Sequence, residues 1–424
     1  MVIGGAVLVG LFLLVALNGR SGGLENRLTA YRAAGIPVTF DELERGCLEI
    51  PDSENEALKV EEAVGGWLHL GTINLLDGTF PDSLVRDDAS WVNVELSRNA
   101  GSLERIHSVT ESARGRFRIV RTAGDERVNR MHTCWHWIQG GVGMMKVEAR
   151  VECLRGNPAR ASRALVSGLR VLRMGEGIPM AGRVWELAQL RDDLLAELEK
   201  VFSGPPVEPP ALEAMAREMA LQEAGLGSTL ALRDLRCEIL ESFRRNWEDS
   251  GAINGAAPGL LERSVFSLYK GAGIPGRDLG RVLAALDEFE ARVEGPPERF
   301  FAIEPRRLEE SGVPGALNHL FSNQETRYRQ LMYALWEQQA RSVAGIRCAV
   351  TALAIERWRL RHGGTLPERL EQLVPGLLPS IPVRPIDGGA LRYLPTRSGY
   401  GLECSTHDHD VRGPVRFIVK FQPR

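Results

Sequence analysis

MMKVEARVECLRGNPARASRALVSGLRVLRM, residues 144–174, is the stretch of the chain that decides the fold. Its two halves each carry apolar residues at helical spacing, and Gly156-Asn157-Pro158 separates them. Because glycine commonly ends a helix and proline is favoured in the first turn, the pattern predicts two helices, 144–155 and 159–174, joined by a tight turn. We expect αα-hairpins of this kind to build the middle of the chain.

Apolar stripes at helical spacing continue on the far side of this hairpin. One stripe has successive spacings of 3, 4, 4 and 3 residues, and a second has spacings of 3, 4, 4 and 4. A helix with such a stripe must bury it against neighbouring helices. The sequence therefore predicts an irregular helical bundle over residues 61–342, with proline-rich breaks at 204–206 and 295–297. The two stripes consist of Leu187, Leu190, Leu194, Leu198 and Val201, and of Leu232, Leu235, Ile239, Phe243 and Trp247.

The amino end is apolar all round. Val2–Leu17 is an unbroken run of 16 apolar residues, close to the lower length limit for a membrane-spanning helix. A core helix usually has a polar face, and this run has none. We predict a single transmembrane anchor at 1–19, followed by a juxtamembrane segment at 20–60. Within that segment, Thr39 is placed to cap a short helix, with Glu42 three residues later.

The last eighty or so residues, 343–424, predict a small α+β segment. A long helix is expected to end near Gly363-Gly364, and a short second helix is expected over 365–373. Alternating apolar residues and a turn signal then predict three antiparallel strands near 391–394, 400–404 and 415–419. The fold class is thus mainly α, and the long helix is expected to pack on the small sheet.

Part of this tail resembles type II secretion pseudopilins. The run 352–363, ALAIERWRLRHG, is similar to the end of their long helix, and Leu366-Pro367-Glu368, Asp387-Gly388 and Leu391-Arg392-Tyr393 follow in the same order. Nearly the whole chain is similar to a family of membrane-anchored bacterial proteins of unassigned activity, typified in planctomycetes. Members share a segment like the one that leads here from Gly35-Ile36-Pro37 to Ile50-Pro51-Asp52-Ser53.

The resemblance implies one membrane pass with the bulk of the chain outside the cytoplasm. The charges that follow the apolar run, Arg20, Arg27 and Arg32 against Glu25, favour the opposite orientation under the positive-inside rule. We give more weight to the resemblance. The chain departs from pseudopilins at the anchor, because they carry a glutamate inside the apolar helix and Val2–Leu17 contains no acidic residue.

Composition excludes some classes of function. The chain of 424 residues has a formal net charge of −3, so no global positive field favours nucleic acid. The six cysteines contain no CxxC pair, which excludes zinc-ribbon spacing and thioredoxin-like chemistry. Their even number permits disulfides in an exported domain, and the spacing leaves the pairing open.

Two clusters offer metal ligands. His407, Asp408, His409 and Asp410 follow the second predicted strand, where some pseudopilins bind calcium, although these residues copy that loop poorly. Carboxylates would suit calcium and imidazoles would suit zinc, but a solvated loop without a metal is the favoured interpretation. His132 and His136 share a helix face at ligand spacing between tryptophans, a setting more typical of packed core residues.

The sequence contains no pattern that predicts a catalytic set of nucleophile, base and orienting residue, and we expect no cofactor. The glycine motif at Gly271–Gly276 favours a turn before a helix over a dinucleotide site, because Pro275 removes a donor and Asp278 adds negative charge. We therefore expect a membrane-anchored, extracytoplasmic helical scaffold or interaction protein whose protein partner is unknown. The alternatives are a component of a secretion or pilus-like assembly and a metal-dependent enzyme that uses His132 and His136.

Overall fold

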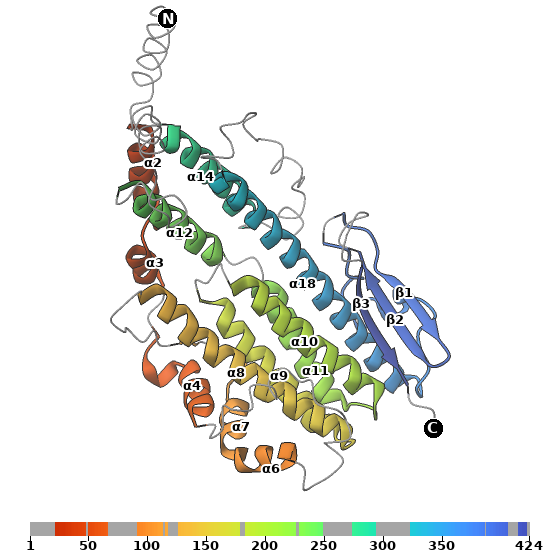
Figure 1. Ribbon diagram of the computed structural model, residues 1–424. Helices are drawn as coiled ribbons and strands as arrows, with labels where there is room; N and C mark the ends of the chain where they lie inside the picture. Colours follow the sequence, from red (N-terminus) through yellow and green to blue (C-terminus); the bar gives the residue numbers. More distant parts are fainter. Residues whose placement is uncertain are drawn as a thin grey trace, which may run out of the picture. The chain divides into compact units, whose positions relative to one another are not determined.

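The chain is mainly helical and ends in a small three-stranded antiparallel sheet, as the sequence predicts (Figure 1). The computed structural model describes residues 22–47, 50–66, 91–112, 115–117, 126–178, 183–225, 229–248, 274–293, 323–385, 387–405 and 414–421. The apolar run Val2–Leu17 lies outside these residues. Among the helices that are described, none is long and apolar enough to span a bilayer.

The chain divides into two compact units. Unit 1 comprises Met1–Leu48, Thr229–Pro296 and Ile303–Ala334, and unit 2 comprises Glu49–Ser228, Pro297–Ala302 and Leu335–Arg424. The boundary that the sequence suggests between residues 342 and 343 falls inside one continuous helix, α18 (Asn323–Arg361). Helical structure therefore continues across the change in composition that marks the start of the predicted tail.

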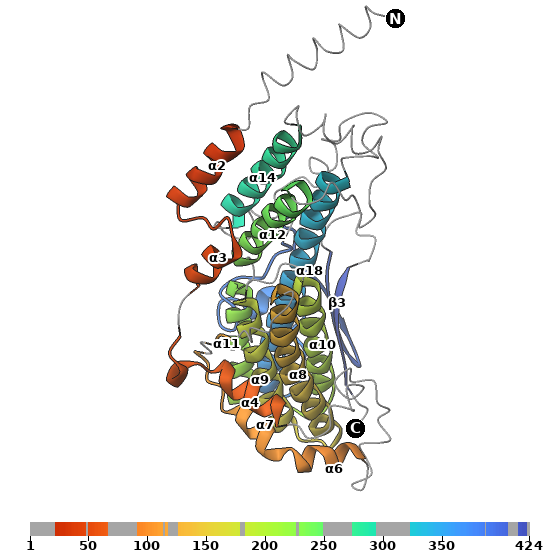
Figure 2. The same cartoon turned by 60° about the vertical axis from the view of Figure 1, so that its left-hand side comes forward.

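Unit 2 is built on a layer of helices that run side by side in both ribbon views (Figures 1 and 2). These are α8 (Glu126–Leu154), α9 (Pro158–Glu176), α10 (Val184–Ser203) and α11 (Pro209–Gly225). Gly156 between α8 and α9 has a φ of 73°, a conformation that glycine adopts without the penalty that a Cβ brings. Asn157 then caps α9 by accepting the Arg160 N–H at 3.4 Å.

The apolar stripe of α10 is buried along its whole length. Leu187, Leu190, Leu194, Leu198 and Val201 expose between 1% and 8% of their surface. The stripe faces α9 closely enough that a Cβ placed on Gly168 would lie 3.1 Å from Leu194 Cδ2. The stripe read from the sequence thus forms part of the core.

Three short helices pack on this layer within unit 2. They are α4 (Ala57–Gly65), α6 (Trp91–Arg98) and α7 (Ala100–His107), and a 3₁₀ turn at Asp52–Glu54 precedes α4. Two consecutive glycines on α8 let α4 approach, because a Cβ on Gly140 would lie 2.6 Å from Val64 and a Cβ on Gly141 would lie 2.8 Å from Val60. A side chain at either position would push the two helices apart.

The second half of α18 packs on the sheet. After α18 the chain forms a 3₁₀ turn, Leu370–Leu373, which is shorter than the predicted helix over 365–373 because the residues from Thr365 to Arg369 have no helical structure. The strands β1 (Arg392–Thr396), β2 (Gly399–Cys404) and β3 (Val415–Lys420) follow in the order β1-β2-β3. Tyr400 on β2 is opposite Pro395 on one side and Val419 on the other.

Neither edge of the sheet offers a full ladder of free donors. At the β3 edge the Ile418 and Lys420 N–H groups donate to side chains of α10, to Glu199 Oε1 at 3.1 Å and to Ser203 Oγ at 3.1 Å. The alternation of the ladder places Pro395 on the outer side of β1, where it has no N–H to offer. Both features are known devices against edge-to-edge strand pairing.

The contact at the β3 edge should depend on pH. Burial raises the pKa of Glu199 from 4.5 to about 7, although the Ile418 N–H and Lys200 act to lower it. The folded protein therefore holds a proton that the unfolded chain releases, so this contribution to stability is complete below pH 4.5 and is lost as the pH rises through about 7.

We expect the melting temperature of the wild type to fall more between about pH 5 and pH 8 than that of Glu199→Gln. Parallel melting curves for the two proteins would contradict this, and Glu213→Gln on the exposed face of α11 is the control.

Unit 1 contains α2 (Gly22–Ala33), α3 (Phe40–Gly46), α12 (Thr229–Glu248), α14 (Ile274–Val293) and the first turns of α18. Thr39 caps α3 as predicted, accepting the Glu42 N–H at 3.2 Å, and the Glu42 carboxylate in turn accepts the Val38 N–H at 2.8 Å. Of the second predicted stripe, Leu232, Leu235 and Ile239 are buried. Phe243 is half-buried, and the side chain of Trp247 lies outside the described residues.

Candidate functional site

A serine, a histidine and a glutamate meet inside unit 2. His107 ends α7, Glu148 lies on α8 and Ser167 lies on α9. The Nδ1 atom of His107 is 2.9 Å from Ser167 Oγ, and its Nε2 atom is 2.8 Å from Glu148 Oε2. A neutral imidazole that donates to Glu148 and accepts from Ser167 satisfies all three groups at once. This trio is the candidate site with the most chemical character in the described residues.

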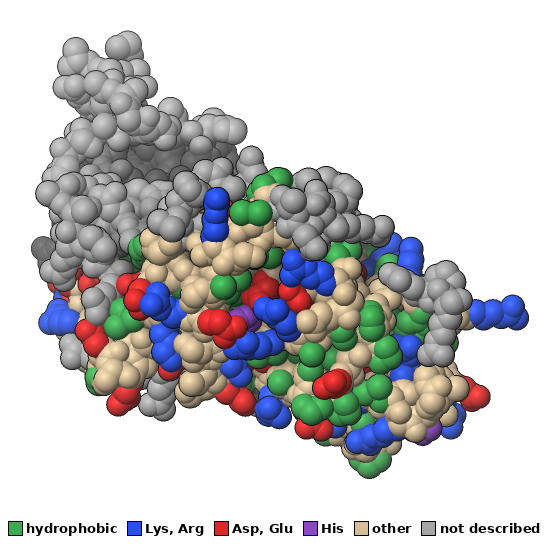
Figure 3. Space-filling model, turned by 90° about the horizontal axis from the view of Figure 1, so that it is seen from below, with side chains coloured by type: hydrophobic (Ala, Val, Ile, Leu, Met, Phe, Trp, Pro, Cys, Tyr) green, Lys and Arg blue, Asp and Glu red, His purple; other side chains and the backbone are tan. Residues whose placement is uncertain are grey.

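Arg160 on α9 and side chains of the turn after α8 extend the polar contacts from Glu148 to Glu152. Arg160 lies 3.7 Å from Glu148 and 3.8 Å from Glu152. Glu152 also accepts hydrogen bonds from Arg155 at 3.0 Å and from the Asn157 side chain at 3.1 Å. On the described part of the face shown in Figure 3, basic and acidic side chains are interspersed rather than gathered into one sign. The arginines therefore balance local carboxylates.

The trio has the composition of a hydrolytic relay but not its exposure. In such a relay the histidine takes a proton from a hydroxyl that attacks the substrate, so the hydroxyl must be reachable. The side chain of Ser167 is enclosed, with 2% of the residue exposed, and the side chain of His107 is 1% exposed. Next to Ser167, Gly168 packs against Leu194 and Met145. In this geometry the trio fastens α7 to α8 and α9.

Sequence reasoning missed this trio. His107 and Glu148 are separated by 41 residues, and His107 and Ser167 by 60 residues. No local motif links them, since the contact arises only when three helices pack. The sequence offers no distinct signal, because Glu148 has Glu152 one turn away and Ser167 has Arg163 and Arg170 as its helical neighbours.

The residues considered as candidate metal ligands lie mostly outside the part of the chain that the structure describes. His407, Asp408, His409 and Asp410 all lie outside the described residues, and so does the side chain of His132. His136 is half-buried, and its ring meets Trp137 edge-on with centroids 5.1 Å apart. Within the described residues no group of three or more histidine, cysteine or acidic side chains is arranged to hold a metal ion.

Cys134, between the two histidines, is buried, and its surroundings do not favour the reactive thiolate form. Burial raises the pKa of its thiol to about 11, with a further contribution from Glu61, so the thiolate is scarce at neutral pH. Of the glycine motif, Gly271–Gly273 lie outside the described residues, and α14 begins directly afterwards at Ile274.

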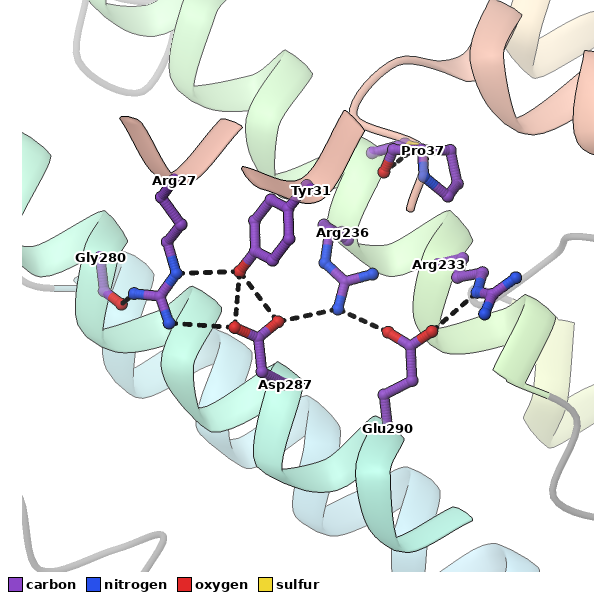
Figure 4. A network of polar contacts seen from close by, with 9 residues as sticks. Arg27, Tyr31, Pro37, Arg233, Arg236, Gly280, Asp287 and Glu290 are labelled. Carbon is purple, nitrogen blue, oxygen red and sulfur yellow. Dashed lines mark hydrogen bonds and ion pairs between the residues drawn. The ribbon is translucent and has the colours of Figure 1, made fainter. Parts of the chain in front are cut away.

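Unit 1 contains a separate network of charges (Figure 4). Asp287 on α14 accepts hydrogen bonds from Arg27 at 3.0 Å, from the Tyr31 hydroxyl at 2.7 Å and from Arg236 at 3.0 Å. Arg236 continues to Glu290 at 2.6 Å and stacks over the Tyr31 ring at 4.9 Å. The network joins α2 to α12 and α14.

Electrostatics in this network follow from burial. Burial, together with the hydrogen bond and charge of Asp287, raises the pKa of Tyr31 to about 12. Burial acts to lower the pKa of Arg236, but the carboxylates of Glu290 and Asp287 raise it above its ordinary value. Both groups therefore keep their usual protonation state at neutral pH, which suits a structural junction rather than proton transfer.

The junction predicts a local effect of Asp287→Asn. The amide keeps the shape but removes the charge that Arg27 and Arg236 share, so α2 should loosen from α14. We expect backbone amides of α2 to exchange with solvent roughly 10-fold faster or more, which corresponds to a loss of at least about 1.4 kcal/mol, while α8 and α9 are unchanged. Hydrogen exchange with mass spectrometry on the full chain measures this. Unchanged protection of α2 would contradict it, and Asp41→Asn at an exposed position of α3 in the same unit is the control.

No family model, curated protein or solved structure matches the chain.

Proposed function

We propose that the chain is a membrane-anchored, extracytoplasmic scaffold that holds one or more protein partners. The architecture that this proposal needs is an N-terminal membrane helix at Val2–Leu17 followed by an irregular bundle of αα-hairpins. The observation that supports a scaffold role is the enclosure of the Ser167–His107–Glu148 trio, because both ring nitrogens contact neighbouring helices and Ser167 is 2% exposed. Its chemistry is used to fix helix positions.

The position of the apolar run supports this proposal. Unit 1 contains the amino end of the chain, and α2 begins at Gly22, a few residues after Leu17. The charge network on Asp287 holds α2 to α12 and α14 within the same unit. Because α2 is fixed in this way, it would connect the membrane helix directly to a folded unit and not to a flexible linker.

The experiment has two parts on the full chain in native membranes. A fluorophosphonate probe, which labels activated serines, is expected to leave Ser167 unlabelled, at the level of the Ser167→Ala variant. Covalent cross-linking in the membrane, followed by electrophoresis of the tagged chain, is expected to give a discrete species of higher mass. Labelling that disappears in Ser167→Ala, or a chain that remains entirely uncross-linked, would overturn the proposal.

A component of a secretion or pilus-like assembly is the second candidate. It is favoured by the order of a long helix, α18, followed by an antiparallel sheet, which is what the resemblance to pseudopilins implies. The covered β3 edge and Pro395 on β1 argue against assembly by strand addition. The same cross-linking decides between the two: a ladder at multiples of the chain mass supports an assembly, and one discrete species supports the scaffold.

A further inference from the structure

Two cysteines from different elements of unit 2 meet in its core. Cys348 lies on α18 and Cys404 ends β2, and both are buried in the same core. Val415, which pairs with Cys404 across the sheet, lies so close to α18 that a Cβ on Gly345, one turn before Cys348, would be 3.9 Å from it. A second contact fixes the alignment, because Tyr400 Oη lies 3.0 Å from Glu356 Oε1 and 3.5 Å from the Ala352 carbonyl oxygen. Along β2, Cys404 lies four residues after Tyr400, a distance of about 13 Å. Along α18, Cys348 lies eight residues before Glu356, a distance of about 12 Å. The two distances are nearly equal, as expected if β2 runs along α18 in the opposite direction and brings Cys404 opposite Cys348.

We propose that Cys348 and Cys404 form a disulfide bond that fastens the C-terminal sheet to α18. Both residues are buried with 0% exposure, and Cys404 shares the inner face of β2 with Tyr400 and Leu402. For bond formation in the cell, the inference rests on the proposed extracytoplasmic location, since disulfides persist in oxidising compartments. Formation during refolding in a test tube does not depend on that location.

The environment makes the two sulfurs unequal. The hydrogen bond from Cys348 and the charges of Arg347 and Arg384 lower the pKa of the Cys404 thiol, although burial acts to raise it. The same hydrogen bond, together with burial, raises the pKa of the Cys348 thiol. Arg347 is held beside the pair by bonds to Glu223 at 2.8 Å and to the Val383 carbonyl oxygen at 2.7 Å. As the sheet docks and this environment forms, Cys404 becomes the more acidic of the two thiols, so we assign it as the attacking thiolate.

The reaction is two thiol–disulfide exchanges with a small disulfide such as oxidised glutathione. The Cys404 thiolate attacks one glutathione sulfur, the glutathione disulfide breaks, and one glutathione thiolate leaves. Cys348 then loses its proton and attacks Cys404 Sγ in the mixed disulfide, which releases the second glutathione. The protein loses two hydrogens in total, and two glutathione thiols form. Because both sulfurs are enclosed once folding is complete, the exchange takes place as the sheet docks on α18.

The test uses the full-length protein in detergent. It is unfolded, reduced, and refolded in a buffer of oxidised and reduced glutathione, and remaining thiols are then blocked. Digestion without reduction and mass spectrometry should find the peptide of Cys348 joined to that of Cys404, with the expected loss of two hydrogens. The bond closes a long loop, so the oxidised protein should melt about 5–10 °C higher than the same protein after reduction. Cys47→Ala, which changes a half-buried thiol elsewhere, should leave both results unchanged.

Refolded protein in which Cys348 and Cys404 are both blocked as thiols, or in which either is joined to a different cysteine, would overturn the inference. So would a melting difference that persists in a Cys348→Ala, Cys404→Ala double variant. If the bond forms in the refolded protein while the intact cell keeps it reduced, the pairing stands and the proposed location fails.

Discussion

Replacing Arg191 with methionine should lower the free energy of unfolding by about 3–5 kcal/mol. The Arg191 guanidinium on α10 is 2% exposed, pairs with Glu176 at the end of α9 and donates to Ser342 Oγ on α18 at 3.0 Å. Burial lowers the pKa of Arg191 to about 10, so it remains charged at neutral pH. Methionine fills much of the same space but leaves the carboxylate of Glu176, itself 10% exposed, without its counter-charge.

A second substitution separates the pair from the packing. In Arg191→Met, Glu176→Leu both charges are gone, and we expect it to recover a large part of the lost stability. Urea titration of the detergent-solubilised full chain, followed by circular dichroism, provides the measurement. Arg217→Met, at an arginine that is 56% exposed on α11, should change little. If Arg191→Met behaves like Arg217→Met, the buried pair does not hold α9, α10 and α18 together.

Truncating Leu194 to alanine should cost about 2–5 kcal/mol, because it removes buried methyl groups and leaves a cavity. Leu194 is 1% exposed, lies at the centre of the α10 stripe and packs against the α9 backbone at Gly168. The surrounding helices are held by neighbouring contacts and can close the space only in part. We therefore expect an effect near the upper half of that range.

The matched control for Leu194→Ala is Leu360→Ala. Leu360 near the end of α18 is 41% exposed, so the same truncation there should cost well under 1 kcal/mol. The same urea titration compares the two variants. Equal midpoints for Leu194→Ala and the wild type would show that the stripe is not part of the stabilising core.

The elements that the sequence predicted well are those specified by local patterns. Five apolar residues at helical spacing identified α10, and the cap at Thr39 identified the start of α3. Turn residues between alternating segments located the three strands to within a few residues. In each of these cases the physical cause, burial of one face or satisfaction of helix-end donors, acts between near neighbours in the chain.

The parts that the sequence did not predict depend on contacts between distant segments. The first part of α18, around Asn323–Gln330, is polar and has no apolar stripe. The sequence therefore did not predict that the long helix begins at Asn323, well before residue 343. The contacts of His107 with Glu148 and Ser167, and the pairing of Cys348 with Cys404, each join residues at least 41 positions apart. Such groups come together only when helices or strands pack, so the spacing of residues along the chain does not predict these contacts.

The most direct test of the proposed scaffold concerns the side of the membrane on which its bulk lies. Two fusions after Arg424 are compared in intact cells, one to alkaline phosphatase, which is active only after export, and one to a fluorescent protein that fails to mature there. The proposal predicts an active phosphatase and a dark fluorescent fusion, with phosphatase activity lost when Val2–Leu17 is deleted. A bright fluorescent fusion together with an inactive phosphatase would contradict it.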